Sequence, residues 1–362
     1  ARPPTLNRPA DFHVPDRFGT LRFVGRIPQC RAGEQWSKAD AASWAARVGW
    51  LVGCNFIPST ASNQLELWQE ETFDPDTIDR ELGWARAIGM NAVRVYLHDL
   101  LWEADSKSFV SRVRAFLRLA AKHRIGVIPV LFDDCWNMDP KLGPQEPPRP
   151  GVHNSRWVQS PGKAVVNDVL AWPRLQRYVQ GIMQAFRSDR RILMWDLYNE
   201  PGNSEQGNAS FPLLKAAFEW ARAAAPTQPL TVGVWADMPD LNKFQLTNSD
   251  VITFHNYNDA ASLQTQIESL RGYGRPIICT EWMARPTSTA ATHLPIFKAA
   301  GVGCLNWGLV SGKTQTIFPW RSPGGGPEPD PWFHDLLRPD GTPYDPRETQ
   351  LFSSLSGKRT MR

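Results

Sequence analysis

The chain has 362 residues, of which 42% are hydrophobic and 21% are charged, a balance that permits a packed core and excludes global disorder. The 40 basic residues exceed the 36 acidic ones by only +4, which is too little to indicate a nucleic-acid or anionic-membrane partner. No apolar run reaches the ~20 residues that a membrane-spanning helix needs. The composition includes 16 tryptophans against 6 tyrosines, which indicates an unusual core or flat aromatic faces for a ligand.

The first segment, residues 1–35, is rich in Pro and Arg and has no periodicity. We expect it to form an irregular leader, followed by one catalytic domain over residues 36–362. The leader shows no basic-then-apolar signal pattern. We expect a secreted or periplasmic protein whose signal lies outside this sequence, with a cytoplasmic location as the alternative. None of the five cysteines forms a C-x-x-C pair, so we expect buried thiols rather than a zinc site or disulfides.

Strand-like apolar segments alternate with helical patterns along the rest of the chain, as is typical of a parallel sheet. Most are apolar throughout, as strands covered on both faces must be. The predicted strands are Trp50–Phe56, Ala92–Leu97, Gly126–Phe132, Ile192–Tyr198, Leu230–Trp235, Val251–His255, Pro276–Thr280 and Val302–Trp307. Eight β/α units in this order predict an α/β fold, a (β/α)8 TIM barrel of ~250 residues enlarged by insertions.

Amphipathic helices are predicted between these strands, and Asp74 and Asp259 precede two of them as candidate N-caps. The predicted helices are Pro75–Ile88, Phe109–His123, Trp172–Phe186, Phe211–Ala225, Ala261–Tyr273, Thr289–Ala300 and Glu348–Leu355. No glycine-rich phosphate loop follows any predicted strand, so the pattern disfavours nucleotide binding.

Two long insertions follow predicted strands three and eight, at Asp133–Ala171 and Val310–Thr342. Loops of this length are usually functional or mobile, and both leave the face on which barrel enzymes place their sites. The insertions carry Trp136, His153, Trp157, Trp320 and Trp332. Two interpretations stay open: these side chains narrow the site to a pocket for short oligosaccharides or chain ends, or they only pin the loops to the barrel.

Two glutamates end two strands on opposite sides of the predicted barrel. Glu200 lies in the motif Asn199-Glu200-Pro201 after the fourth strand, and Glu281 ends the seventh. A single strand-end glutamate is more often an ion-pair partner. Two that project into one mouth have the arrangement that acetal hydrolysis needs, with one acid for the leaving oxygen and one carboxylate for the anomeric carbon.

Together with Glu281, the Asn-Glu-Pro motif resembles clan A of the glycoside hydrolases, and specifically the cellulase-like family 5, over about residues 45–355. The resemblance implies a retaining β-glycosidase that degrades oligo- or polysaccharides by double displacement through a covalent glycosyl-enzyme. It assigns Glu200 as acid/base, Glu281 as nucleophile and Asn199 as a partner of the sugar 2-hydroxyl. It implies no cofactor and no metal.

Further positions fit the same family pattern. Arg94 fits the strand-two arginine beneath the nucleophile, where a guanidinium keeps Glu281 ionised. His255 and Tyr257 fit the strand-six pair near the two glutamates. Trp307 fits the strand-eight tryptophan that forms the floor of the reacting subsite.

The sequence also departs from the family after strand three, where family 5 members often carry a histidine. Residues 133–136 read Asp-Asp-Cys-Trp instead, which indicates a divergent branch. We expect His98, after strand two, to be an alternative sugar contact. Asp134, Trp136 and Trp282 complete the predicted substrate-binding set. For the neighbouring acids Asp133 and Asp134, we favour binding of sugar hydroxyls or capping of a turn over a cation site.

Several functions stay open beside the leading one. A transglycosylase, or a glycosidase for an uncommon sugar, would use the same scaffold. A catalytically silent carbohydrate-binding barrel would not need both glutamates. An enzyme for phosphorylated metabolites would need a phosphate loop near strand seven or eight, and Gly324–Gly326 is too far from a strand end.

We expect burial and a neighbouring negative charge to raise the pKa of Glu200. Among partners we expect a carbohydrate, no nucleic acid and no membrane, and the protein to be a monomer.

Overall fold

The computed structural model describes residues 33–357, in which eight parallel strands form one sheet in the order β5-β4-β3-β2-β1-β8-β7-β6. The strands are β1 (Val52–Asn55), β2 (Ala92–Tyr96), β3 (Gly126–Asp133), β4 (Trp195–Asn199), β5 (Leu230–Thr231), β6 (Ile252–His255), β7 (Ile277–Glu281) and β8 (Gly303–Trp307). The sheet closes where Val234, just after β5, pairs with Phe254 of β6. The predicted (β/α)8 barrel is therefore confirmed.

All eight predicted strands are present, and β5 differs most from its prediction. It was predicted over Leu230–Trp235 and is only two residues long. Its ladder to β4 ends at Thr231, and three residues later the backbone of Val234 bonds β6 instead, with its N–H donating to Thr253 at 3.1 Å. Changing partners in this way closes the barrel but shortens the strand.

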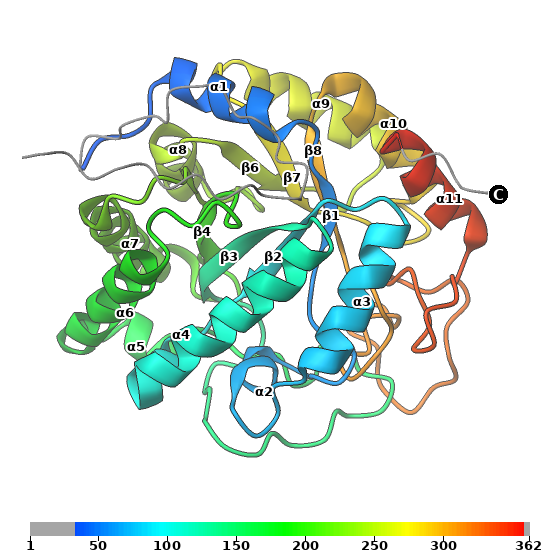
Figure 1. Ribbon diagram of the computed structural model, residues 1–362, viewed down its shortest axis with the longest axis horizontal. Helices are drawn as coiled ribbons and strands as arrows, with labels where there is room; N and C mark the ends of the chain where they lie inside the picture. Colours follow the sequence, from blue (N-terminus) through cyan, green and yellow to red (C-terminus); the bar gives the residue numbers. More distant parts are fainter. Residues whose placement is uncertain (1–32, 358–362) are drawn as a thin grey trace, which may run out of the picture.

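Helices surround the strands (Figure 1). They are α1 (Lys38–Val48), α2 (Gln64–Trp68), α3 (Pro75–Ala87), α4 (Asp99–Lys122), α5 (Lys163–Val166), α6 (Trp172–Ala185), α7 (Phe211–Ala224), α8 (Pro239–Asn248), α9 (Ala260–Arg271), α10 (Ala290–Ala300) and α11 (Pro346–Leu355). The two predicted N-caps are confirmed, because Asp74 accepts from the backbone N–H of Thr77 at 3.0 Å and Asp259 from that of Ser262 at 2.9 Å.

The sequence did not predict α1, α2, α5 or α8. Helix α8 buries only Leu241 and Gln245, and α1 only Ala41 and Trp44. With only two buried residues each, these helices show little of the apolar periodicity from which a helix is predicted.

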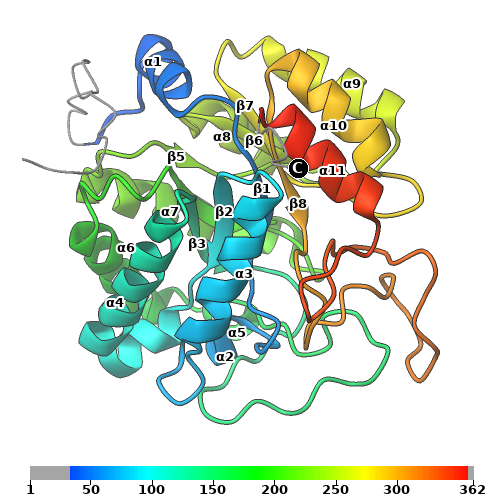
Figure 2. The same cartoon turned by 45° about the vertical axis from the view of Figure 1, so that its right-hand side comes forward.

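The two ends of the barrel differ in what covers them. Trp36 and Trp44, the latter on α1, pack on the first residues of several strands in a separate apolar cluster. The long segments after β3 and β8 lie at the opposite end in both views (Figures 1 and 2). This places the insertions at the carboxyl ends of the strands, as predicted.

The cysteines within the described residues are free and buried, namely Cys54, Cys135, Cys279 and Cys304. Cys30 and most of the predicted leader fall outside residues 33–357. Among the helices of that described range, none combines the length and the apolar character needed to cross a membrane.

Candidate active site

The two predicted glutamates meet at the carboxyl end of the barrel. Glu281 is the last residue of β7 and Glu200 directly follows β4. One oxygen of each glutamate and one ring nitrogen of His255 lie within 4.8 Å of one another. All three line a cavity of about 770 Å³ together with Asn199, Tyr257 and Trp307.

Three side chains hold both oxygens of Glu281. Arg94 donates from Nη1 to Oε1 at 2.7 Å, and the hydroxyl of Tyr96 donates to the same oxygen at 2.8 Å. The hydroxyl of Tyr257 donates to Oε2 at 2.8 Å. Both oxygens therefore act as acceptors, which is the hydrogen-bonding pattern of an ionised carboxylate. The side chain is fixed in one orientation beneath the cavity.

Arg94 lies fully buried under Glu281 and does not line the cavity. It also donates to Asp196 at 3.0 Å and to Asn199 Oδ1 at 2.7 Å. Burial by itself lowers the pKa of Arg94, but its interactions with Tyr96, Asp196 and Glu281 raise it well above its ordinary value. Arg94 is thus a permanent cation that positions other groups rather than a sugar contact.

Glu200 has donors on both oxygens as well. His255 Nδ1 lies 2.7 Å from Oε1, while the thiol of Cys135 and the amide of Asn203 approach Oε2 at 3.2 Å and 2.5 Å. Burial raises the pKa of Glu200, yet the hydrogen bond and charge of His255, with the other two donors, bring the pKa below its ordinary value. This corrects the expected direction, because the sequence did not show how many donors converge on this carboxylate.

Asn199 is held between two charged groups at the end of β4. Its Oδ1 accepts from Arg94, and its Nδ2 donates to Asp133 Oδ1 at 2.9 Å. Asp133 also accepts from the indole N–H of Trp157 at 2.7 Å. Burial raises the pKa of Asp133 to about 7 against these hydrogen bonds. The amide orientation of Asn199 is thereby fixed toward the cavity.

Aromatic side chains shape the cavity. Trp307 ends β8 and packs edge-on against Tyr96, with ring centres 5.9 Å apart. Trp136 and Trp320, from the two insertions, are 39% and 41% exposed at its mouth. Trp332 is instead buried and stacked on Tyr344 at 4.5 Å. Trp136 and Trp320 therefore border the cavity, whereas Trp332 packs within its own insertion.

Three predicted sugar contacts lie away from the cavity. His98 is buried as the N-cap of α4, and its Nε2 contacts the carbonyl of Gln159 at 2.9 Å. Trp282 points out of the barrel and stacks on His293 at 5.9 Å, because it follows Glu281 and successive strand residues face opposite sides. These positions correct the predicted substrate-binding roles of His98 and Trp282.

Asp134 is the third correction. It is fully buried and accepts from Tyr198 at 2.6 Å, from the backbone of Gly202 at 2.7 Å and from Gln206 at 2.8 Å. It also accepts from the hydroxyl of Ser210. Its role is to fix the turn that carries Glu200. The turn-capping reading of this acid therefore fits better than hydroxyl binding.

Sequence reasoning missed several residues of the cavity and of the network beneath it. Tyr96 lies two positions after Arg94, and period-two alternation along β2 would have found it. Asn203 follows Glu200 by three residues in a turn that no sequence pattern indicates. Cys135 was noted only as the residue present where a histidine is common.

Within residues 33–357, Glu200, His255 and Glu281 are the group whose spacing would suit a metal ion. Glu281 is already saturated by Arg94, Tyr96 and Tyr257. The guanidinium beside it repels a cation. The arrangement is better suited to carboxylate chemistry than to metal ligation.

Comparison with protein families gives the decisive match: the cellulase family, glycosyl hydrolase family 5, matches residues 85–312, which include both glutamates. The chain belongs to glycoside hydrolase family 5. It is accordingly an enzyme of the glycoside hydrolase class, and the predicted resemblance is confirmed. No curated protein matches the family 5 chain in sequence at a significant level.

Solved structures share the barrel at low sequence identity. A GH5_18 protein from Streptomyces cattleya, in complex with Manb1-4GlcNAc, is 14% identical with a TM-score of 0.58, over 86% of this chain and 81% of that chain. The exo-β-1,4-mannosidase Op5Man5 from Opitutaceae bacterium strain TAV5 is 17% identical, with a TM-score of 0.60, over 85% and 59%. An endo-β-1,4-mannanase from Thermotoga petrophila is 14% identical, with a TM-score of 0.56, over 86% and 77%. At these identities the likeness establishes the fold.

Proposed function

We propose that this family 5 member is a retaining β-glycosidase in which Glu281 is the nucleophile and Glu200 the acid/base. One observation carries the proposal: oxygens of the two carboxylates lie within 4.8 Å of each other. Retaining glycosidases hold their carboxyl groups ~5–5.5 Å apart, whereas inverting ones leave ~6.5–9.5 Å for a water molecule.

In the first step an oxygen of Glu281 forms an ester bond to the anomeric carbon, and the bond from that carbon to the leaving oxygen breaks. Glu200 gives its proton to the leaving oxygen. Arg94, Tyr96 and Tyr257 hold the attacking carboxylate, so little reorientation is needed before attack. In the second step Glu200 takes a proton from a water molecule that attacks the same carbon, and the ester bond to Glu281 breaks.

Glu200 must carry a proton in the first step, and His255 Nδ1 lies 2.7 Å from its Oε1. Burial raises the pKa of Glu200, and the hydrogen bond and charge of His255, with hydrogen bonds from Cys135 and Asn203, lower it. His255 is therefore a positioning residue for the proposed acid/base.

The sugar ring that reacts would lie on Trp307, since an indole face packs well against the C–H face of a sugar. Asn199, fixed by Arg94 and Asp133, would bind its 2-hydroxyl. The solved neighbours include an exo-β-1,4-mannosidase, an endo-β-1,4-mannanase and a protein in complex with Manb1-4GlcNAc. β-Mannosides are therefore the first substrates to test, beside glucosides, xylosides and galactosides.

The test is hydrolysis of aryl β-glycosides of these four sugars, with the first anomer released followed by NMR. We expect the β-anomer to appear first, and Glu200→Ala to slow turnover of poor leaving groups ~10²–10⁴-fold. Glu281→Gln should abolish turnover. Glu205→Gln, an exposed glutamate on the same turn, is the matched control and should retain activity. Release of the α-anomer first, or activity in Glu281→Gln, would overturn the assignment.

A further inference from the structure

The segments after β3 and β8 are hydrogen-bonded to each other. The backbone N–H of Asn154 donates to the carbonyl of Thr314 at 2.8 Å. Gln315 accepts from the N–H of Gly151 at 2.7 Å and donates to the carbonyl of Arg149 at 2.8 Å. Residues 149–157 and 314–325 thus form a single structure, here called the loop wall, at the lower edge of Figure 2.

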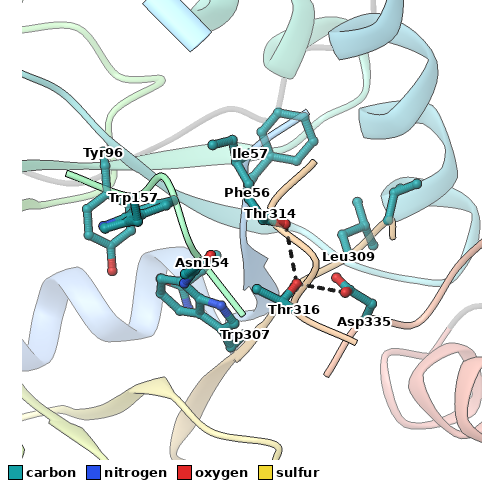
Figure 3. A pocket seen from close by; sticks show the side chains of 13 residues that line it. Phe56, Ile57, Tyr96, Asn154, Trp157, Trp307, Leu309, Thr314, Thr316 and Asp335 are labelled. Carbon is teal, nitrogen blue, oxygen red and sulfur yellow. Dashed lines mark hydrogen bonds between the residues drawn. The ribbon is translucent and has the colours of Figure 1, made fainter. Parts of the chain in front are cut away.

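The loop wall closes the side of the barrel where β1 and β2 end. These two strands lie between β8 and β3 in the sheet, so segments from β3 and β8 that join must cross them. Figure 3 shows Asn154, Trp157 and Thr314 gathered around Trp307 and Ile57. The void that remains among these side chains is about 10 Å³, which is barely the space that one water molecule needs.

The positions of the two glutamates set the direction of the substrate. The ring whose anomeric carbon is attacked must lie against Glu281, on β7 and next to Trp307 on β8. The leaving oxygen must face Glu200, on β4 across the barrel. The far end of the reacting ring, where a preceding sugar would be attached, therefore points toward the loop wall.

The leaving-group side is open by contrast. A second cavity of about 470 Å³ shares Trp235, His255, Asn256 and Asn258 with the main cavity and continues over β5 and β6. Its polar lining includes Asn242 and Gln266, amides that suit sugar hydroxyls. Among residues 33–357, space for additional sugars lies on this side, whereas behind Trp307 the void is only about 10 Å³.

We propose that the enzyme is exo-acting: it removes single sugar units from the non-reducing ends of chains. One ring lies between Trp307 and Glu281 with the loop wall against its non-reducing end, and the rest of the chain extends over β5 and β6. The inference rests on the proposed glycosidase function and adds to it the substrate class, which is the chain end.

The test uses the sugar whose aryl β-monoglycoside is hydrolysed, supplied in two further forms. The first is a set of oligosaccharides of increasing length with a fluorescent label at the reducing end. The second is the aryl β-disaccharide, free or blocked at its non-reducing 4- and 6-hydroxyls by a benzylidene acetal. Products are separated by chromatography for the wild-type enzyme and for Glu281→Gln as a blank.

We expect labelled products that shorten by one unit at a time, together with free monosaccharide. The free aryl disaccharide should release its aryl group only after a lag, and the blocked form should react at least 100-fold more slowly. Internal cleavage, or direct release of the intact disaccharide, overturns exo action and leaves the glycosidase function standing. Absence of hydrolysis with every sugar, aryl monoglycosides included, overturns the glycosidase function itself.

Discussion

His255 Nδ1 lies 2.7 Å from Glu200 Oε1 and 3.6 Å from Glu281 Oε2. One imidazole therefore touches the proposed acid/base and lies beside the proposed nucleophile. Burial raises the pKa of Glu200, but the hydrogen bond and charge of His255, together with hydrogen bonds from Cys135 and Asn203, bring it below its ordinary value. The groups that contact this carboxylate together outweigh its burial.

Replacing His255 should reverse the shift at Glu200. In His255→Asn the contribution of His255 to Glu200 is gone and burial remains, so we expect the pKa of Glu200 to rise above its wild-type value. Infrared difference spectroscopy of the carboxylic acid C=O stretch during a pH titration measures it. Glu200→Gln in the same background identifies the band. An unchanged pKa would show that His255 does not control this carboxylate.

The thiol of Cys135 contacts Glu200 at 3.2 Å and accepts from Asn199 Nδ2 at 3.3 Å. Removing a hydrogen bond of this kind costs about 1 kcal/mol, so Cys135→Val should lower kcat/KM about 5-fold. Cys135→Ser, which keeps a donor, should lose less. The control is Cys304→Val, a buried thiol on β8. Equal losses in kcat/KM from both valine variants would assign the effect to packing rather than to the contact with Glu200.

Local sequence signals predicted the fold and the strand-end positions of Glu200 and Glu281. Strands covered on both faces are apolar throughout, and Asn199-Glu200-Pro201 lies at the end of one of them. The same signals do not predict the contacts of a side chain that is held by a turn from another segment or that faces the outer side of the barrel. Asp134 was predicted as a sugar contact because it follows β3, but four donors from β4 and the segment after it surround it.

The position of a tryptophan in the sequence indicated whether it faces the cavity only when its burial was also known. Trp282 and Trp307 both stand at strand ends, yet one faces the outer helices and the other the cavity. Among the loop indoles, Trp320 lines the cavity while Trp332 is stacked in the loop. The positions of the loop indoles depend on contacts between two insertions that are far apart in sequence. Neither insertion's own sequence predicts those contacts.

These two kinds of indole predict different mutant behaviour. Trp307→Ala should raise KM and lower kcat/KM about 10-fold or more, because the reacting ring loses its apolar floor. Trp332→Ala should cost about 3–5 kcal/mol of unfolding free energy with little change in KM. Steady-state kinetics and urea denaturation of both variants separate the effects. A lower KM in Trp307→Ala would contradict its place under the sugar.

Asp99 supplies a pH-dependent part of the stability. Burial raises its pKa, but hydrogen bonds and charge from His98 and Arg174 lower it from 3.8 to about 2. Because the folded-state pKa is depressed, the stabilisation is present above 3.8 and is lost as the pH falls toward 2.

At pH 7, Asp99→Asn should therefore reduce the unfolding free energy by about 2 kcal/mol. The deficit should shrink below pH 4. Urea denaturation at several pH values measures it, with Asp168→Asn, an exposed aspartate, as control. A deficit that stays constant with pH would mean that charge on Asp99 is not its source.

The loop wall should loosen when Gln315 is shortened. Gln315→Ala removes two hydrogen bonds between the insertions, to the N–H of Gly151 and to the carbonyl of Arg149. Loss of about 1 kcal/mol of local protection corresponds to roughly 5-fold faster amide exchange. We expect that acceleration at Gly151. Gln145→Ala is the control, because Gln145 donates to the carbonyls of Lys141 and Gly143 and accepts from Asn63, and none of these bonds joins the two insertions. Hydrogen exchange at Gly151 that is no faster in Gln315→Ala than in this control would show that the two insertions do not depend on each other.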